Sequence, residues 1–110
     1  MQHWDLRSLK VEPHRPIILH SSRGEARSIA IQLQAGDQLK EHQVHERAYL
    51  LVVEGEIEVR RDGDAVSGGA GFMAVFDPAE RHEVRARVDT RLVLLLAPWP
   101  GDGHPGARDD

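Results

Sequence analysis

Residues 49–60, YLLVVEGEIEVR, decide the fold class of this chain. Their first five residues form a short, strongly β-prone run that is interrupted before Gly55. After the glycine, Ile57 and Val59 alternate with charged residues, and this period of two is typical of a strand with one buried face. Asp62-Gly63 follows, which is a strong signal for a tight hairpin turn. The stretch therefore predicts two strands and a turn into a third.

Strand patterns continue on both sides of this stretch. Upstream, residues 27–33 alternate between apolar and polar side chains. Downstream, 65–66 is a minimal strand, 68–71 (GGAG) is expected to form a loop, and 72–76 is a fully apolar strand. Residues 92–96 (LVLLL) are the most hydrophobic run and predict a central strand. Many short strands separated by Gly, Pro and Asp predict an all-β sandwich or barrel.

One predicted strand places a histidine on its buried face. From position 82 onward, four residues share one side and the charged residues share the other; the first set is His82, Val84, Ala86 and Val88, and the second is Glu83, Arg85 and Arg87. We therefore expect His82 to point into the interior. An ordinary core histidine with one hydrogen-bond partner is the alternative to a functional role.

Residues 37–47 have two interpretations. The segment is rich in good helix formers, and Asp37 could serve as a helix N-cap. A helix would place His42 and His45 on one face, whereas a regular strand would place them on opposite faces.

Length and composition restrict the classes of protein that remain. At 110 residues the chain is expected to form one domain: residues 1–26 as a segment packed on the barrel or exchanged in a dimer, 27–97 as the barrel, and 98–110 as an extended or disordered tail. A net charge of -4 with scattered Lys and Arg argues against a nucleic-acid partner. The start of the chain lacks a signal-peptide pattern and no apolar run reaches transmembrane length, so we expect no membrane partner and a cytoplasmic location.

Two groups of glycines and histidines add a family resemblance. Gly36 is followed after five residues by His42, and Gly55 closes this first group; Gly71, Pro78 and His82 form the second. Together they resemble the two motifs of the cupin superfamily over roughly residues 27 to 97. The resemblance implies an all-β, cupin-type double-stranded β-helix, which is a jelly-roll barrel.

The chain also departs from these motifs. Val44 stands where the second histidine is expected, with His45 one place later, and Ala48 stands where the glutamate is expected. The spacing from Pro78 to His82 is one residue short.

The resemblance implies a divalent metal ion, Fe, Mn, Ni or Zn, in a histidine-lined barrel pocket. The chain has no cysteine, so the ligands must be nitrogen or oxygen atoms. On a regular strand the inward set is His42 and Glu46, joined by His82. A bulge near 43–44 would instead turn His45 inward in place of Glu46. A solvated loop is the alternative for His42 and His45, so both ligand sets remain open.

Two functions follow from such a pocket. One is a metal-dependent enzyme, a dioxygenase or isomerase, that acts on a small molecule bound at open coordination positions. The other is a metal-free module that binds or senses a small molecule, which is favoured by Ala48. In either case we expect a homodimer, because Leu51 and Val53 lie on the opposite parity from Leu50 and Val52 and need a cover.

Overall fold

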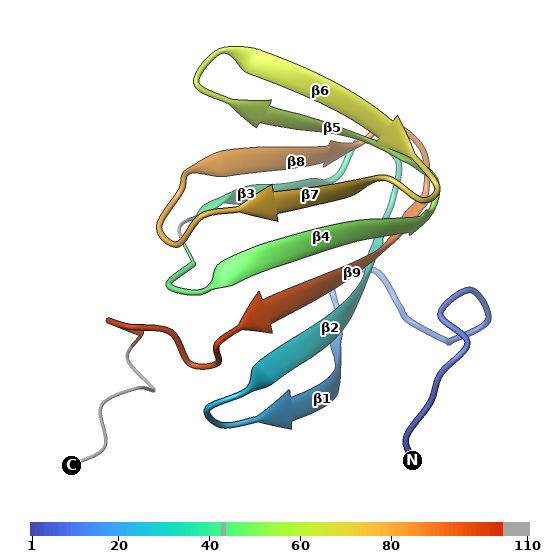
Figure 1. Cartoon of the computed structure of the whole chain (residues 1–110). Coiled ribbons are helices and arrows are strands. Elements are labelled where there is room, and N and C mark those ends of the chain that lie inside the picture. The colour runs from blue at the N-terminus through green and yellow to red at the C-terminus, as the bar shows by residue number, and fades with distance from the viewer. Residues whose placement is uncertain (43, 105–110) are drawn as a thin grey trace.

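The computed structural model describes residues 1–42 and 44–104, with the backbone alone at 40–42. Within these residues the chain forms nine strands and no helix (Figure 1). The strands are β1 (Ile17–Ser22), β2 (Ala26–Leu33), β3 (Gln38–His42), β4 (Arg47–Glu54), β5 (Glu56–Arg61), β6 (Asp64–Gly69), β7 (Met73–Phe76), β8 (His82–Ala86) and β9 (Thr90–Ala97).

The strands form two antiparallel sheets packed face to face. The five-stranded sheet has the order β1-β2-β9-β4-β7, and the four-stranded sheet has the order β3-β8-β5-β6 (Figure 1). This arrangement confirms the predicted all-β jelly-roll. The hydrophobic run at 92–96 lies in β9 between β2 and β4, so its prediction as a central strand is also confirmed.

Alternation along the strands places one set of side chains between the sheets. On β4, every second residue is about 1% exposed, and Ile57 and Val59 of β5 are also buried. The core cluster draws on both sheets: Ile31, Leu33, Ala48, Leu50, Val52, Ile57, Val59, Phe76, Val84, Ala86, Leu92 and Leu96. Burial of this apolar surface is the main force that holds the two sheets together.

The buried face of β8 begins with a histidine. His82, Val84 and Ala86 are buried as the alternation predicts. Val88 was expected to share this face, but it is 47% exposed because β8 ends at Ala86 and Val88 belongs to the turn before β9.

Residues 38–42 form a strand and not a helix. β3 pairs with β8, with Leu39 opposite Val84 and His42 opposite His82. Between these pairs the chain advances three residues on β3 and two on β8, so the ladder contains a one-residue irregularity before His42. The bulge predicted near 43–44 cannot be compared with this irregularity, because Gln43 lies outside the described residues.

The β6 strand corrects one prediction. The glycine-rich stretch was expected to form a loop, yet Gly68 and Gly69 pair with β5. A Cβ added to Gly68 would lie 2.1 Å from Cγ of Phe72. The glycine is therefore needed because the Phe72 ring occupies the space that a side chain would fill.

The outer faces of the two sheets differ in chemistry. On the four-stranded sheet, Glu58 accepts hydrogen bonds from Arg60 Nε at 2.5 Å and from Arg87 Nη2 at 2.8 Å. Both bonds lower the pKa of the Glu58 carboxyl, and the bond from Arg60 has the larger effect. On the five-stranded sheet the outer face is apolar at the middle of β9, β4 and β7, between Arg47 and Arg91.

This apolar surface consists of two cross-strand rows. Tyr49 of β4 lies opposite Val75 and Leu95, and Leu51 lies opposite Met73 and Val93. Met73 is 57% exposed, Val75 49% and Leu95 37%. We call these six residues, Tyr49, Leu51, Met73, Val75, Val93 and Leu95, the outer apolar patch.

The chain before β1 packs beside this patch. Arg91 Nη1 donates hydrogen bonds to the carbonyl oxygens of Leu6 at 2.8 Å and Leu9 at 2.6 Å. Val11 is buried. The described residues include no helix long and apolar enough to cross a membrane.

Candidate ligand-binding site

His82 lies between the sheets at the start of β8. It is 7% exposed, and its ring stacks on Phe76 with the centroids 3.7 Å apart and an interplanar angle of 3°. Its Nδ1 lies 3.2 Å from the carbonyl oxygen of Glu80. Because a carbonyl oxygen can only accept, this contact places a proton on Nδ1 and leaves Nε2 as the nitrogen that can accept or bind a metal when the ring is neutral.

The other predicted cavity histidine comes from the neighbouring strand. His42 of β3 is the direct backbone partner of His82. Segments forty residues apart are thus brought side by side, as the motif spacing predicts. The His42 side chain lies outside the described residues, so its predicted role as a ligand stays a prediction.

Glu46 and His45 lie in different surroundings. Glu46 is 1% exposed, and its Oε2 accepts a hydrogen bond of 2.7 Å from the backbone N–H of Gly101. His45 is exposed, and its ring makes an edge contact with His104 at 5.6 Å. The Glu46 carboxylate therefore attaches residues 98–104 to the start of β4, while His45 lies on the outside of this contact.

The described donors do not complete a metal site. Among the side chains that the structure describes, no group of three or more His, Asp or Glu residues is arranged to hold an ion. Ala48, at the position where the motif has glutamate, is 1% exposed and offers only a methyl group. His82 with its oriented Nδ1 fits one ligand of such a site, and the backbone of His42, the predicted second ligand, lies directly opposite it.

A cavity of about 270 Å³ opens where the edges of the two sheets meet. β6 and β7 are edge strands of different sheets (Figure 1). The residues that line the cavity place it between the β5–β6 hairpin and β7. Its lining residues are Val59, Arg61, Asp64, Val66, Phe72, Ala74, Val75, Phe76 and Glu80. Phe76 belongs both to this lining and to the stack on His82, so the cavity reaches the residue next to the buried histidine.

The polar groups of the cavity gather at its rim. Arg61 Nε lies 3.0 Å from Glu80 Oε2, and Glu80 Oε1 accepts a 3.0 Å hydrogen bond from the N–H of Asp77. Both carboxylate oxygens of Glu80 are therefore engaged. Asp64, the backbone partner of Arg61, supplies a second carboxylate to the rim.

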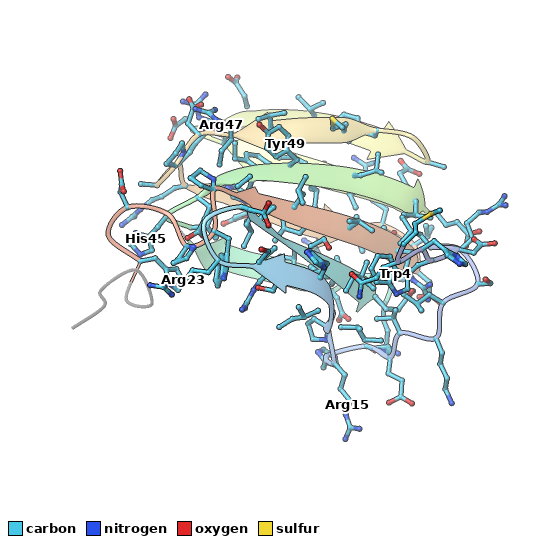
Figure 2. All side chains as sticks on the ribbon, turned by 60° about the horizontal axis from the view of Figure 1, so that its bottom comes forward. Trp4, Arg15, Arg23, His45, Arg47 and Tyr49 are labelled. Atoms are coloured by element: carbon cyan, nitrogen blue, oxygen red, sulfur yellow. The ribbon has the colours of Figure 1, made fainter. Side chains whose placement is uncertain are left out.

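A second cavity of about 250 Å³ lies at the end of the molecule that holds His45. Its lining residues are His45, Arg47, Pro78, Ala97, Pro98, Gly101 and Asp102. Figure 2 shows His45 at the opposite end of the molecule from Trp4. The Arg47 guanidinium is paired with Asp77 at 2.5 Å. Unlike the first cavity, this one has no Val or Phe in its lining.

Sequence patterns did not point to the rim of the first cavity. Glu80 lies in the connection between β7 and β8 and has no strand pattern around it, yet its side chain is only 14% exposed and pairs with Arg61. One signal was available: Arg61 has the same strand parity as Ile57 and Val59, which predicts that its stem lies on the inner face.

Two antiparallel sheets in this order, with a histidine pair across β3 and β8, define a small jelly-roll domain. The family model described as "Cupin domain" matches residues 30–98. The chain belongs to this family.

Solved structures agree with the fold. An RmlC-like cupin protein from Desulfovibrio desulfuricans is similar with a TM-score of 0.76 and 22% identity, over 89% of this chain and 96% of that one. KdgF from a Halomonas species has a TM-score of 0.69 and 22% identity, over 82% of this chain and 85% of that one. A cupin superfamily protein from Desulfitobacterium hafniense has a TM-score of 0.73 and 10% identity, over 83% of this chain and 84% of that one. No curated protein matches the sequence.

Proposed function

We propose that this cupin domain binds a small molecule in the cavity between the β5–β6 hairpin and β7. The observation that supports this function is the lining itself. Six of its residues are apolar, the charged residues stand at the rim, and Phe76 joins the cavity to the buried His82. A largely apolar hollow with a few polar groups is the usual form of a small-molecule site.

The volume restricts the size of the ligand. About 270 Å³ lies just below the range of about 300–1,000 Å³ that is usual for ligand pockets. The cavity therefore suits a molecule with one ring or a short branched chain. A ligand in contact with Phe76 would also change the surroundings of the His82 ring, which stacks on it at 3.7 Å.

Benzyl alcohol, a neutral one-ring molecule, is a suitable probe of this function. At about 0.5 kcal/mol for each non-hydrogen atom, we expect a dissociation constant of about 1 mM. In ¹H–¹⁵N NMR spectra, titration should shift the amides of Val59, Val66 and Phe76. Shifts confined to other regions of the protein would contradict the proposal.

A matched pair of variants locates the binding. Ala74 lines the cavity, and Ala74→Phe should fill it and weaken benzyl alcohol about tenfold or more. Ala65 on β6 has the opposite parity from the lining residue Val66 and is exposed, so Ala65→Phe adds the same ring outside the cavity and should leave binding unchanged. Val66→Trp serves as a second blocking variant, because Val66 is 55% exposed and tolerates a larger side chain.

We further propose that the protein is a homodimer in which the outer apolar patch of one subunit packs on the same patch of the other. The contrast between the two outer faces supports this assembly, since the charged face of the four-stranded sheet suits water and the patch does not. Such a pairing would be isologous, as is usual for dimers.

A metal-dependent function is the second candidate, and two observations favour it. His42 and His82 are backbone partners, and the Nδ1 contact of His82 with Glu80 is typical of a histidine whose other nitrogen binds a metal. The ligands would be His42 and His82 with Glu46 or His45. A bound divalent ion would supply Lewis-acid polarisation of a coordinated oxygen.

Elemental analysis of protein purified without an affinity tag tests this candidate. If it is correct, Fe, Mn, Ni or Zn is present at about one ion per chain and is lost in His82→Ala. His20→Ala is the control, because the exposed His20 lies on β1 and is held to Gln2. Metal retained in His82→Ala, or absent after incubation with each ion, would eliminate the candidate and leave the binding function intact.

A further inference from the structure

The polar rim of the cavity indicates which charge its ligand has. Arg61 is already neutralised, with its Nε 3.0 Å from Glu80 and 3.8 Å from Asp62. Glu80 is neutralised in turn by Arg61, and its other oxygen accepts a hydrogen bond from the N–H of Asp77. Asp64 is different: within the described part of the chain, no Lys or Arg side chain forms an ion pair with it.

The floor of the same cavity is aromatic and aliphatic. Phe72 packs on Gly68 at its base, and Phe76 is fixed by its stack on His82. Val59 and Val66 face each other as backbone partners on the hairpin, and Asp64 lies two residues before Val66 on the same side of β6. The rim carboxylate that lacks an ion pair among the described residues therefore lies beside the apolar residues of the lining.

Resting on the proposed function, we infer that the ligand is a small organic cation: an apolar or aromatic body with one protonated amine. The body lies on Phe72, Phe76 and Val66, and the ammonium pairs with Asp64. The lining has two carboxylates and one guanidinium, so a cation brings it to neutrality, whereas an anion would have to displace Glu80 from Arg61.

Benzylamine, benzyl alcohol and benzoate share a ring and differ in charge, so together they test the inference. Because Asp64 is exposed, its ion pair should be modest, and we expect benzylamine to bind about three- to fivefold more tightly than benzyl alcohol, with benzoate the weakest. The preference should shrink as salt is added. Affinities come from NMR titration of the wild-type protein.

Charge-matched variants identify the responsible residue. Asp64→Asn should bring benzylamine to the affinity of benzyl alcohol and leave benzyl alcohol unchanged. Asp62→Asn removes the same charge from a side chain that lies two residues earlier and outside the lining. This variant should keep the preference for benzylamine. Asparagine also tolerates the positive φ of 49° at position 62.

The outcomes separate this inference from the proposed function. Equal binding of benzylamine and benzyl alcohol, or tightest binding of benzoate, would overturn the cation and keep the cavity as a binding site. A preference that survives in Asp64→Asn would also overturn it. If none of the three probes shifts the cavity amides, both the inference and the proposed function fail.

Discussion

The Gly55→Ala variant is expected to lose about 2–5 kcal/mol of unfolding free energy. Gly55 joins β4 to β5 with a φ of +106°, a conformation that costs an alanine about 1–2 kcal/mol. A Cβ there would also lie 2.3 Å from Oγ1 of Thr90 and 2.7 Å from the carbonyl oxygen of Asp89. Relief of such overlap adds about 1–3 kcal/mol.

The atoms around Gly55 cannot move aside without a loss of hydrogen bonds. Thr90 is fully buried, and its Oγ1 accepts a hydrogen bond from the Glu56 N–H at 3.1 Å and contacts the Val88 carbonyl at 2.8 Å. Movement of Thr90 would therefore disturb the start of β9 and the step from one sheet to the other.

Thermal and urea unfolding of a matched variant separate the steric cost from the backbone cost. Gly36 has a similar φ of +88°, but a Cβ added there would have no atom within 4 Å beyond its chain neighbours. Gly36→Ala should lose only about 1–2 kcal/mol. Since 1 kcal/mol corresponds to about 4–8 °C in a domain of this size, the two melting temperatures should be well separated. Equal losses of unfolding free energy in the two variants would show that Thr90 moves aside without cost.

The Met73→Lys/Leu95→Lys double variant is expected to be a monomer at concentrations where the proposed wild-type dimer forms. Met73 and Leu95 lie on either side of β4 within the outer apolar patch, and both are already exposed in one subunit. The substitutions should leave the fold of the subunit intact. In an isologous dimer each lysine appears twice, so four charges would be buried without partners and the dissociation constant should rise at least about a hundredfold.

Sedimentation velocity at micromolar concentration checks this result. Val88→Lys is the control, because Val88 is 47% exposed in the turn before β9 and lies outside the patch. It should remain dimeric. A wild-type protein that sediments as a monomer throughout, or a double variant that stays dimeric, would rule out the proposed interface.

The alternation of apolar and polar residues predicted most of the fold, because every second residue of these strands is buried between the sheets. The alternation of β4, β5 and β8 identified the inner face correctly, including His82. The helix signal at 37–47 was misleading, since pairing with β8 outweighs local propensity. The glycines of β6 were predicted to form a loop because glycine is common in loops. Gly68 lies in a strand because the Phe72 ring leaves no room for a side chain there, and sequence patterns do not reveal that contact.

The candidate site was less predictable from the sequence. Motif spacing indicated that positions 42 and 82 meet, and the register of β3 and β8 agrees. The cavity was not foreseen, because its walls come from the edges of two sheets that do not pair with each other. The contact of Glu46 with Gly101 also depends on where the chain returns after β9, and strand periodicity contains no information on that path.

The position of β9 has a consequence for how the protein is made. β2 and β4 meet only through β9, although β9 is the last of the nine strands to leave the ribosome. Until residues 90–97 emerge, the nascent β2 and β4 lack the strand that pairs with both of them, and the backbone groups along those edges stay without their partners. Folding must therefore wait for nearly the whole barrel to be translated, and this interval is when chaperone binding or aggregation would compete most strongly.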